Sequence, residues 1–209
     1  MGCGWRFPFM FGVAKYIQEH NNDKCIKYVG VSGGTAVAYS LQSNNVDLFY
    51  KKALSQRAEC KYSPFGMSNL IENVAQECAT IIPPKNTLFL VATRVKNFGI
   101  FEADILSEFE SIDDLCKCMR ASSQIPLLSG TITYKYNKKY YIDGELSVNI
   151  DKIRSMFGEC IVVDFCENAD IKPSIQIPRS WSYFPQDDQG MEAMYNHGYM
   201  KAEEFFSKY

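Results

Sequence analysis

The stretch that most constrains the fold is residues 27–40, KYVGVSGGTAVAYS, in which an apolar run ends abruptly among three glycines and a serine. The run is short and rich in β-branched side chains, which predicts a strand buried on both faces. The small side chains that follow predict a helix packed close to the sheet. A sharp strand-to-helix turn exposes a serine hydroxyl and crowds the residues two before and two after it. Ser32, flanked by Gly30 and Gly34, is therefore a candidate nucleophile at such an elbow.

Two other interpretations of this motif are open. The glycines could form a turn that only allows tight packing of helix on sheet. Alternatively, Ser32, Gly33 and Gly34 could cradle a phosphate, as in the S-G-G-x-D-S loop of ATP pyrophosphatases. Ala36 stands where that loop has its acid, and Thr35 stands where a Walker loop has its lysine after the last glycine. Both differences from the known phosphate-binding loops disfavour a phosphate site.

The rest of the chain alternates between strand-like and helix-like patterns. Strands separated by helices predict an α/β sandwich with a mostly parallel central sheet, and we expect one domain over residues 1–209. Ser111 is a good N-cap for one of the helices, with acidic residues in its first turn. The patterns predict strands at 26–31, 87–95 and 160–165, helices at 33–43, 46–60, 67–79, 111–124 and 188–207, and a hairpin at 131–144.

Composition narrows the function classes. The net charge of -2 provides no basic face, so we expect no nucleic-acid partner. The eight cysteines show no paired framework and follow no secretory signal, so we expect reduced thiols and a cytoplasmic protein. Cys116-x-Cys118 lacks a second cysteine pair or a histidine cluster, so we expect no metal and no cofactor. The sequence contains no run of 18 apolar residues, so we expect no membrane-spanning helix.

A nucleophilic serine needs a base, and the chain has only two histidines, His20 and His197. The order Ser32, Asp143, His197 matches the triad order of α/β-hydrolases, although residue 32 leaves no room for the strands that precede the serine there. Asp143, at the end of an apolar strand and just before Gly144, could instead accept the serine proton directly. Its ordinary pKa of about 3.9 is low for this task, and partial burial would raise it. An Asp-Gly turn that merely closes a hairpin is the alternative.

Three segments, in this order, resemble the marks of the patatin-like phospholipase family, whose members are serine acyl hydrolases with a Ser–Asp dyad. The glycine-rich loop of that family resembles Gly2-Cys3-Gly4-Trp5-Arg6, its elbow Gly30-Val31-Ser32-Gly33-Gly34, and its base motif Asp143-Gly144-Glu145. Residues 121–130, ASSQIPLLSG, are similar to a segment upstream of the family's aspartate. Residues 196–206, NHGYMKAEEFF, are similar to the last helix of its adiponutrin and triglyceride-lipase branch.

The resemblance implies a three-layer α/β/α sandwich and a defined set of roles. It implies that Ser32 attacks an ester carbonyl and that Asp143 takes the serine proton. The backbone N–H groups of Gly2, Cys3 and Gly4 would hold the oxyanion. It further implies an acyl-enzyme on the way to hydrolysis of a phospholipid or an acylglycerol.

Two features depart from the family pattern. The family has a strand just before its glycine-rich loop, whereas this sequence starts at Met1. Glu145 stands where the base motif has Gly or Ala. These departures motivate the alternative that the chain is a weakened or inactive homologue that binds lipid or a protein partner.

Aromatic clusters suggest contact with lipid. Residues 5–12, WRFPFMFG, read either as the start of a core-packing helix or as an apolar lip with Trp5 at a membrane interface. Residues 179–185, RSWSYFP, could line an acyl channel or cap the core. We expect transient, peripheral contact with a membrane or lipid-droplet surface.

Overall fold

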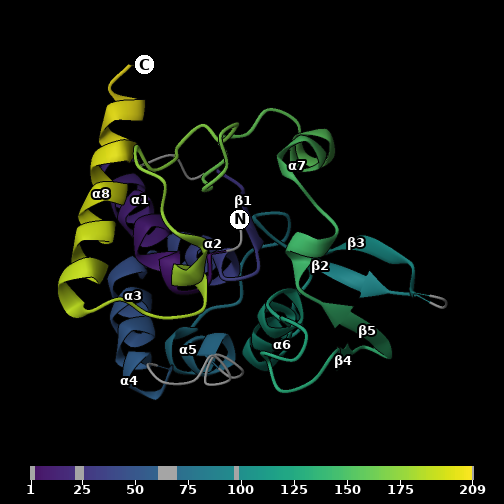
Figure 1. Cartoon of the computed structure of the whole chain (residues 1–209). Coiled ribbons are helices and arrows are strands. Elements are labelled where there is room, and N and C mark those ends of the chain that lie inside the picture. Colours follow the sequence, from purple (N-terminus) through teal and green to yellow (C-terminus); the bar gives the residue numbers. More distant parts are fainter. Residues whose placement is uncertain (1–2, 22–25, 61–69, 97–98, 209) are drawn as a thin grey trace.

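The computed structural model describes residues 3–21, 26–60, 70–96 and 99–208 (Figure 1). It is a mixed α/β structure with one sheet of five strands. The strands are β1 Tyr28–Val31, β2 Leu88–Val95, β3 Phe101–Leu106, β4 Tyr134–Tyr136 and β5 Lys139–Ile142. The α-helices are α1 Phe7–His20, α2 Gly34–Gln42, α3 Val46–Ser55, α4 Arg57–Cys60, α5 Leu70–Cys78, α6 Ile112–Ser122, α7 Ile150–Phe157 and α8 Asp188–Phe206. Short 3-10 helices lie at η1 Gly4–Arg6, η4 Gly144–Leu146 and η5 Arg179–Ser182.

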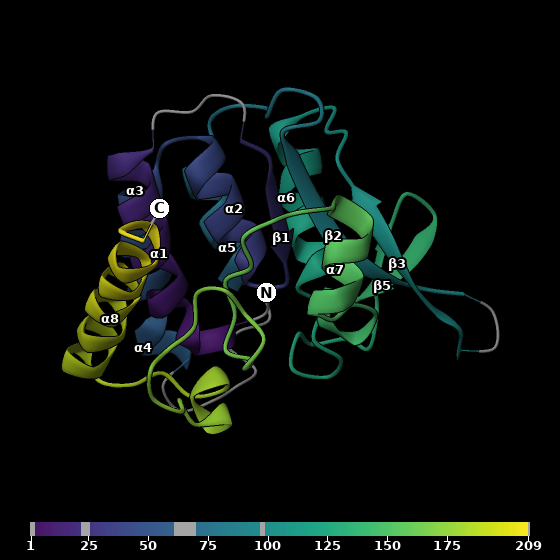
Figure 2. The same cartoon turned by 90° about the horizontal axis from the view of Figure 1, so that it is seen from above.

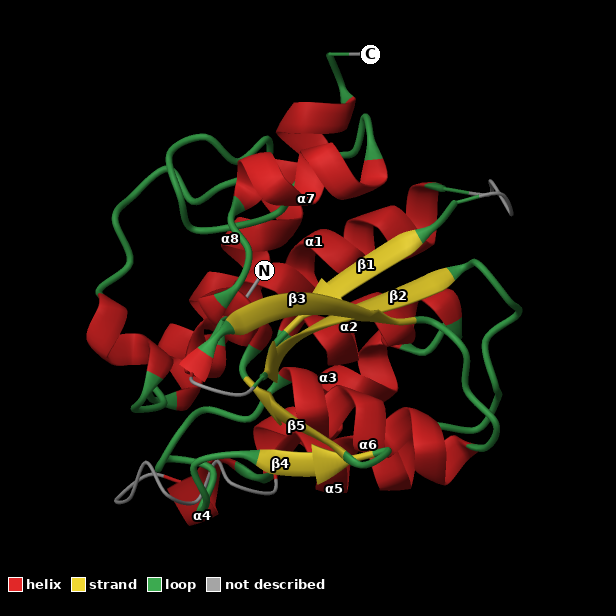
Figure 3. Cartoon of the chain, turned by 90° about the vertical axis from the view of Figure 1, so that its right-hand side faces the viewer, coloured by secondary structure: helices red, strands yellow, loops and turns green. Residues whose placement is uncertain are grey.

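The prediction of a mostly parallel sheet is wrong, because the sheet is mixed (Figure 3). Among the described strands, only the pairing of β1 with β2 is parallel. The pairings of β2 with β3, β2 with β5 and β4 with β5 are antiparallel. The physical reason is the short connections, since a parallel crossover needs a dozen or more residues. Only residues 96–100 join β2 to β3, and Asn137 and Lys138, both at positive φ, make the predicted hairpin between β4 and β5.

The predicted strand at 160–165 does not join the sheet. Within this segment Val163 makes only an isolated bridge, to Ile171. The Val162 carbonyl accepts hydrogen bonds from the N–H groups of Asp170 and Ile171, so the segment pairs with the chain that directly follows it. Its β-branched, apolar composition predicts an extended conformation but not a partner. Conversely, β3 and α7 were not predicted.

Most of the predicted helices are confirmed with shifted ends. The Ser111 hydroxyl caps α6 by accepting a hydrogen bond from the Asp114 N–H at 3.0 Å. The segment 46–60 forms α3 and α4, which are separated at Gln56. In the segment 67–79 the helix α5 begins at Leu70, and residues 67–69 lie outside the described residues.

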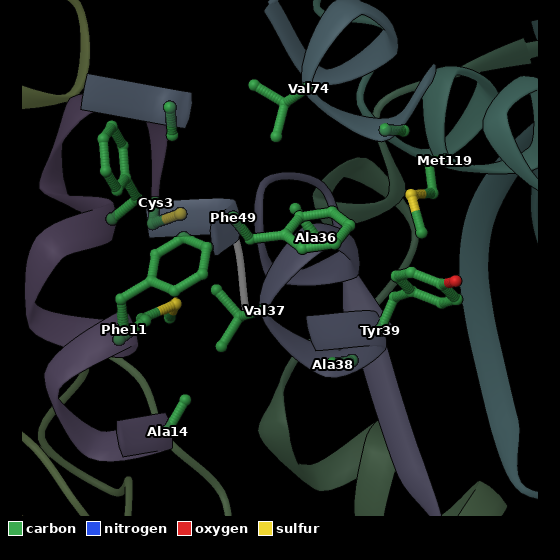
Figure 4. Packing of buried hydrophobic residues seen from close by; sticks show 14 of the residues in the cluster. Cys3, Phe11, Ala14, Ala36, Val37, Ala38, Tyr39, Phe49, Val74 and Met119 are labelled. Carbon is green, nitrogen blue, oxygen red and sulfur yellow. The ribbon is translucent and has the colours of Figure 1, made fainter. Parts of the chain in front are cut away.

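The two faces of β2 belong to different apolar clusters, as period-two alternation requires. Leu88, Leu90 and Ala92 join the main core with residues of α1, α2, α3, α5, α6 and α8. Val91 joins Val31 of β1 and residues of α7 in a second, smaller cluster. In Figure 2, α1 and α8 lie side by side at the end of the molecule farthest from β3. Figure 4 shows side chains of α1 pointing toward those of α2 within the main core.

Strands β1 and β5 share one edge of β2. Strand β3 occupies the other edge, where it pairs along residues 90–95. On the shared edge, β1 runs parallel to β2 and its last residue, Val31, pairs with Val91. Strand β5 arrives from the opposite direction, and its last residue, Ile142, pairs with Thr93. The C-terminal ends of β1 and β5 therefore approach each other head-on in the middle of β2.

Candidate active site

Ser32 and Asp143 are the residues that follow these two strand ends. Both reach the level of Ala92, the one residue of β2 that separates the last partner of β1 from the last partner of β5. Neither chain can continue along the edge without colliding with the other. Ser32 turns into α2 and Asp143 turns into η4, so their side chains meet where the strands stop.

Ser32 sits on the sharp turn that the sequence predicts for it. Its φ of 52° is rare for a residue other than glycine and is typical of nucleophile elbows. Gly30 is needed for the turn, because a Cβ there would lie 2.6 Å from the Thr35 Cα and 2.9 Å from the Gly34 carbonyl oxygen. Gly34 is the first residue of α2, so the N-terminal end of this nine-residue helix adjoins the serine.

The two side chains form a direct hydrogen bond. The Ser32 Oγ donates to Asp143 Oδ2 at 2.6 Å. The second carboxylate oxygen, Oδ1, accepts the Glu145 N–H at 2.9 Å. Both Ser32 and Asp143 are only 5% exposed. The sequence-predicted nucleophile and base are thus in hydrogen-bonding contact although they lie 111 positions apart.

Burial makes Asp143 a stronger base than an ordinary aspartate. Burial is the largest cause that raises its pKa from 3.8 to about 7, and the Glu145 charge adds to the increase. The hydrogen bonds from Ser32 and from the Glu145 N–H act in the opposite direction, because they favour the ionised form. A carboxylate with a pKa near neutrality can both take and return a proton under physiological conditions.

Backbone hydrogen bonds hold Asp143 in place. The Asp143 N–H donates to the Gln124 carbonyl at 2.7 Å, and its carbonyl accepts from the Thr93 hydroxyl at 2.7 Å. Thr93 belongs to β2 and is fully buried. The base is therefore held by β2, and β1 runs toward Asp143 along the edge of this same strand.

Ser122, at the end of α6, holds the elbow. Its Oγ accepts the Ser32 N–H at 2.9 Å and donates to the Val91 carbonyl at 2.6 Å. Ser122 is fully buried, so these two bonds are shielded from water. The Ser32 N–H is consequently engaged and does not point at a substrate. Ser122 lies in the segment 121–130 but was not predicted as a site residue.

The glycine-rich loop lies beside the elbow. Gly2 lies outside the described residues, so its predicted part in the oxyanion hole has no structural description. A Cβ on Gly33 would lie 2.6 Å from the Cys3 Sγ, 3.8 Å from the Gly4 nitrogen and 3.9 Å from the Cys3 nitrogen. The Cys3 and Gly4 N–H groups donate to no other described residue.

Gly4 has a structural requirement of its own. Its φ is 50°, and a Cβ there would lie 2.1 Å from the Ser182 carbonyl oxygen of η5. The aromatic segment at 179–185 therefore packs against the loop at Gly4. Cys3 is not a competing nucleophile, because burial raises the pKa of its thiol to about 12.

An apolar pocket opens next to Ser32. It encloses about 610 Å³ of empty space, a figure that includes open solvent at its mouth. Four helices supply its apolar wall, and the segment after α6 supplies a more polar one. The lining includes Ser32, Cys3, Gly4 and Gly33 at the site, Phe7 and Phe11 of α1, Ala36 of α2, Ala53 of α3, Leu70, Ile71 and Val74 of α5, and Ser123, Ile125 and Ser129.

The aromatic segment at 5–12 is core and not a surface lip. Trp5 and Phe9 are fully inaccessible, and Phe7 and Phe11 are buried. Of the two interpretations of this segment, the core-packing helix is confirmed and the lip with Trp5 at a membrane interface is not, because Trp5 is buried against Phe7 and lines the pocket. Phe7 and Phe11 nevertheless face the same pocket as Ser32.

Neither histidine belongs to this site. His20 is exposed, stacks on Tyr16 and has its Nδ1 3.0 Å from the Tyr16 carbonyl. The His197 Nε2 accepts the Ser174 N–H at 3.1 Å, and its ring packs on Phe9. The hydrogen-bonding partners of the two histidines are thus elsewhere, and the Ser32 hydroxyl donates to Asp143.

Metal and membrane signals are weak in the described part of the chain. There, no group of three or more His, Cys, Asp or Glu side chains is placed to hold a metal ion. Cys116 and Cys118 are buried, and burial raises the pKa of both thiols. Over the same residues, no helix combines the length and apolar character needed to cross a membrane.

Comparison with protein-family models gives no match for this chain, and comparison with curated proteins gives none either.

Proposed function

We propose that the chain is a serine acyl hydrolase that uses a Ser–Asp dyad on carboxylic esters of lipids. The observation that carries the proposal is the 2.6 Å hydrogen bond from Ser32 Oγ to Asp143 Oδ2, made at a strained elbow. A serine hydroxyl bonded to a base whose pKa is about 7 is arranged for nucleophilic attack.

The reaction proceeds through two displacements. Ser32 Oγ attacks the ester carbonyl carbon while its proton passes to Asp143. The tetrahedral intermediate then expels the alcohol, which receives that proton, and an acyl ester remains on Ser32. Water attacks the acyl-enzyme with Asp143 as base, and collapse releases the carboxylic acid and returns the proton to Ser32.

The oxyanion of each intermediate needs hydrogen-bond donors. The unpartnered N–H groups of Cys3 and Gly4, on the loop beside Gly33, are the candidates among the described residues. The positive end of the α2 dipole adds to their effect at the same place. Removal of one donor of this kind typically costs about 10²- to 10³-fold in rate.

The pocket supports an acyl chain as the substrate's apolar part. Its wall of Phe7, Phe11, Ala53, Leu70 and Val74 offers apolar surface and no charge. Burial of each methylene of an acyl chain against such a wall contributes about 0.8 kcal/mol. We therefore propose a phospholipid or an acylglycerol as the substrate and assign no cofactor to the reaction.

The wider proposal is a patatin-like fold and a peripheral, cytoplasmic location. In that fold α7 would form the third layer, opposite the main helical layer. Leu127, Leu146 and Phe184 are 66%, 54% and 47% exposed and lie in segments that border the site, where they could touch a lipid surface. Free thiols, which fit a reducing compartment, are found at Cys3, Cys78, Cys116, Cys118, Cys160 and Cys166.

A catalytically weakened lipid-binding homologue is the second candidate. Glu145 favours it, because an additional carboxylate beside the base opposes ionisation of Asp143. The apolar pocket would then serve binding alone.

A fluorophosphonate probe tests the enzyme proposal. We expect stoichiometric labelling of the wild type, with the modified peptide containing Ser32 by mass spectrometry. Ser32→Ala should abolish labelling, and Asp143→Asn should slow it by about 10²- to 10⁴-fold. Ser40→Ala is the matched control, since Ser40 is also a buried serine and its hydroxyl donates to the Val37 carbonyl within α2. Labelling that persists in Ser32→Ala, or none in the folded wild type, would favour the second candidate.

A further inference from the structure

Glu145 places a second carboxylate beside the base. It follows Asp143 by two residues in η4, and its N–H bonds the Asp143 carboxylate at 2.9 Å. Unlike Asp143, which is 5% exposed, Glu145 is exposed. It forms no ion pair with any cation in the described part of the chain. Within those residues no ion pair neutralises its charge, which can act on a group that approaches Asp143 from solvent.

Its influence reaches both sides of the site. Burial is the largest cause that raises the pKa of Asp143 on one side of the site and the pKa of the Cys3 thiol on the other. In both cases the charge of Glu145 adds to the increase. Asp143 and Cys3 come from segments far apart in the chain. An electrostatic effect on both means that the Glu145 carboxylate lies near the gap between the base and the glycine-rich loop.

The alcohol part of a substrate must leave through this region. The leaving alkoxide needs the proton that Asp143 holds, so its oxygen must come within hydrogen-bonding distance of that carboxylate. The acyl part occupies the apolar pocket, whose lining includes Ser32 but neither Asp143 nor Glu145. The alcohol part is thus the portion that meets Glu145.

The charges that act on the base differ from those that act on the glycine-rich loop. Among the described residues, Glu145 is the only charged group that affects the pKa of Asp143. Arg6 acts on Cys3 and not on Asp143, and its guanidinium lies over the Phe165 ring, 4.1 Å from the centroid. Asp164, a second acidic residue, also acts on Cys3. Close to the base itself, where the alcohol oxygen must come, the charge that acts among the described residues is therefore that of Glu145, whereas near Cys3 the cation Arg6 opposes it.

We propose that Glu145 makes the alcohol side of this site selective by charge. Esters whose alcohol carries an anionic group, such as phosphate, are disfavoured, and those with a neutral or cationic alcohol are favoured. The inference rests on the proposed function, since it concerns the same reaction. It addresses the substrate class directly, because the alcohol part of a glycerophospholipid carries a phosphate and that of an acylglycerol does not.

Three hexanoyl esters with one acyl group test this selectivity. Their alcohols are choline, its neutral carbon isostere 3,3-dimethylbutanol, and the anionic 3-hydroxypropanesulfonate. For the wild type at low ionic strength, we expect kcat/KM to fall in this order, by about two- to fivefold per step. The order should weaken in 0.5 M salt, because added ions screen exposed charges. Dihexanoylglycerol should likewise be preferred to dihexanoylphosphatidate.

Variants at position 145 separate charge from shape. Glu145→Gln should bring the three rates together, Glu145→Lys should reverse the order, and Glu145→Asp should keep it. Glu203→Gln, which removes an exposed carboxylate on α8, should behave as wild type. Equal wild-type rates on all three esters, or an unchanged order in Glu145→Gln, would overturn the inference. In either case, Ser32-dependent hydrolysis would still support the proposed enzyme function. Absence of Ser32-dependent hydrolysis of the neutral ester would overturn both.

Discussion

Ser32 and Asp143 meet because they follow strands that end on either side of Ala92, opposite Val91 and Thr93, one arriving parallel to β2 and the other antiparallel to it. The antiparallel strand belongs to the β4–β5 hairpin, so a local turn at Asn137 and Lys138 sets the register of the base. A one-residue slip in β5 would move Asp143 to the other face of the sheet. The position of the base relative to the nucleophile is thus a property of strand pairing more than of any loop.

The first prediction concerns pH. Asp143 accepts the serine proton only when it is ionised, and burial raises its pKa to about 7. The second-order rate constant for fluorophosphonate labelling should therefore rise with pH and reach half its maximum near 7. In Glu145→Gln the midpoint should move to lower pH, because the Glu145 charge is one of the causes that raise the Asp143 pKa. A flat profile from pH 5 to 9 in folded protein would contradict this role for Asp143.

The second prediction links the same carboxyl group to stability. In the folded state Asp143 keeps its proton up to about pH 7, whereas in the unfolded chain it loses it near 3.8. Between these values the folded state binds more protons, so the free energy of unfolding falls as pH rises. The full difference is about 4 kcal/mol above pH 7.

Asp143→Asn removes this titration and serves as the reference. Urea unfolding at pH 4.5, 6 and 8 should show the wild type losing stability relative to the variant at each step upward. A difference between the two proteins that stays constant with pH would mean that the carboxyl group titrates normally in the folded state.

The third prediction concerns Ser122. In Ser122→Ala the buried Ser32 N–H loses its acceptor, which costs about 1–3 kcal/mol of unfolding free energy. The elbow also loses its link to β2, so fluorophosphonate labelling of Ser32 should slow by at least about tenfold. Ser40→Ala again provides the comparison, since it removes a buried hydroxyl that bonds only to the Val37 carbonyl. Equal labelling rates in the two variants would show that Ser122 has no part in positioning the nucleophile.

The fourth prediction concerns the pocket. Ala53 of α3 is 5% exposed and lines the pocket, so Ala53→Leu should fill part of its volume. Hydrolysis of long-chain esters should fall at least about tenfold more than hydrolysis of butyryl esters, since misplaced acyl groups misalign the carbonyl. Loss of stability affects both substrates equally, so their ratio isolates the pocket. An unchanged ratio would mean that the acyl chain binds elsewhere.

Local patterns predicted the elements that carry Ser32. The run before Gly30 and the small side chains after Gly34 specify β1, the turn and α2, because each depends on neighbours within a few residues. The contact between Ser32 and Asp143 depends on pairing between distant strands, so local patterns offered Asp143 only as one candidate base, and the resemblance to a family singled it out. The hairpin residues Asn137 and Lys138 were recognisable because a tight turn has local requirements.

The missed features have long-range causes. Residues 160–165 look like a buried strand, yet their partners are the residues just after them. Strand β3 is largely exposed or half-buried along its length, so it lacks the apolar alternation that marks a strand. Ser122 looks like an ordinary helix-end serine, and its importance comes from the position of α6 beneath β1 and β2. The similarity of residues 121–130 to the segment upstream of the family's aspartate was the only sequence signal that pointed toward it.

The last prediction tests the placement of the glycine-rich loop beside the elbow. Gly33 has an ordinary helical backbone conformation, so alanine there brings no backbone strain. Its methyl group would nevertheless lie 2.6 Å from the Cys3 Sγ, which must then move and take the loop with it. Because Cys3 and Gly4 carry the candidate oxyanion donors, Gly33→Ala should lower the rate of hydrolysis by about 10²-fold.

A double variant makes this prediction specific. Cys3→Ala removes the sulfur but leaves the backbone N–H groups, so Gly33→Ala combined with Cys3→Ala should recover most of the lost activity. The remaining contacts of the new methyl group, 3.8 Å and 3.9 Å to the two nitrogens, are ordinary van der Waals distances. Cys3→Ala alone should change the rate little, which makes the effects of the two substitutions strongly non-additive. Additive losses would mean that the loop does not contact the elbow, and the oxyanion donors would then have to come from another segment.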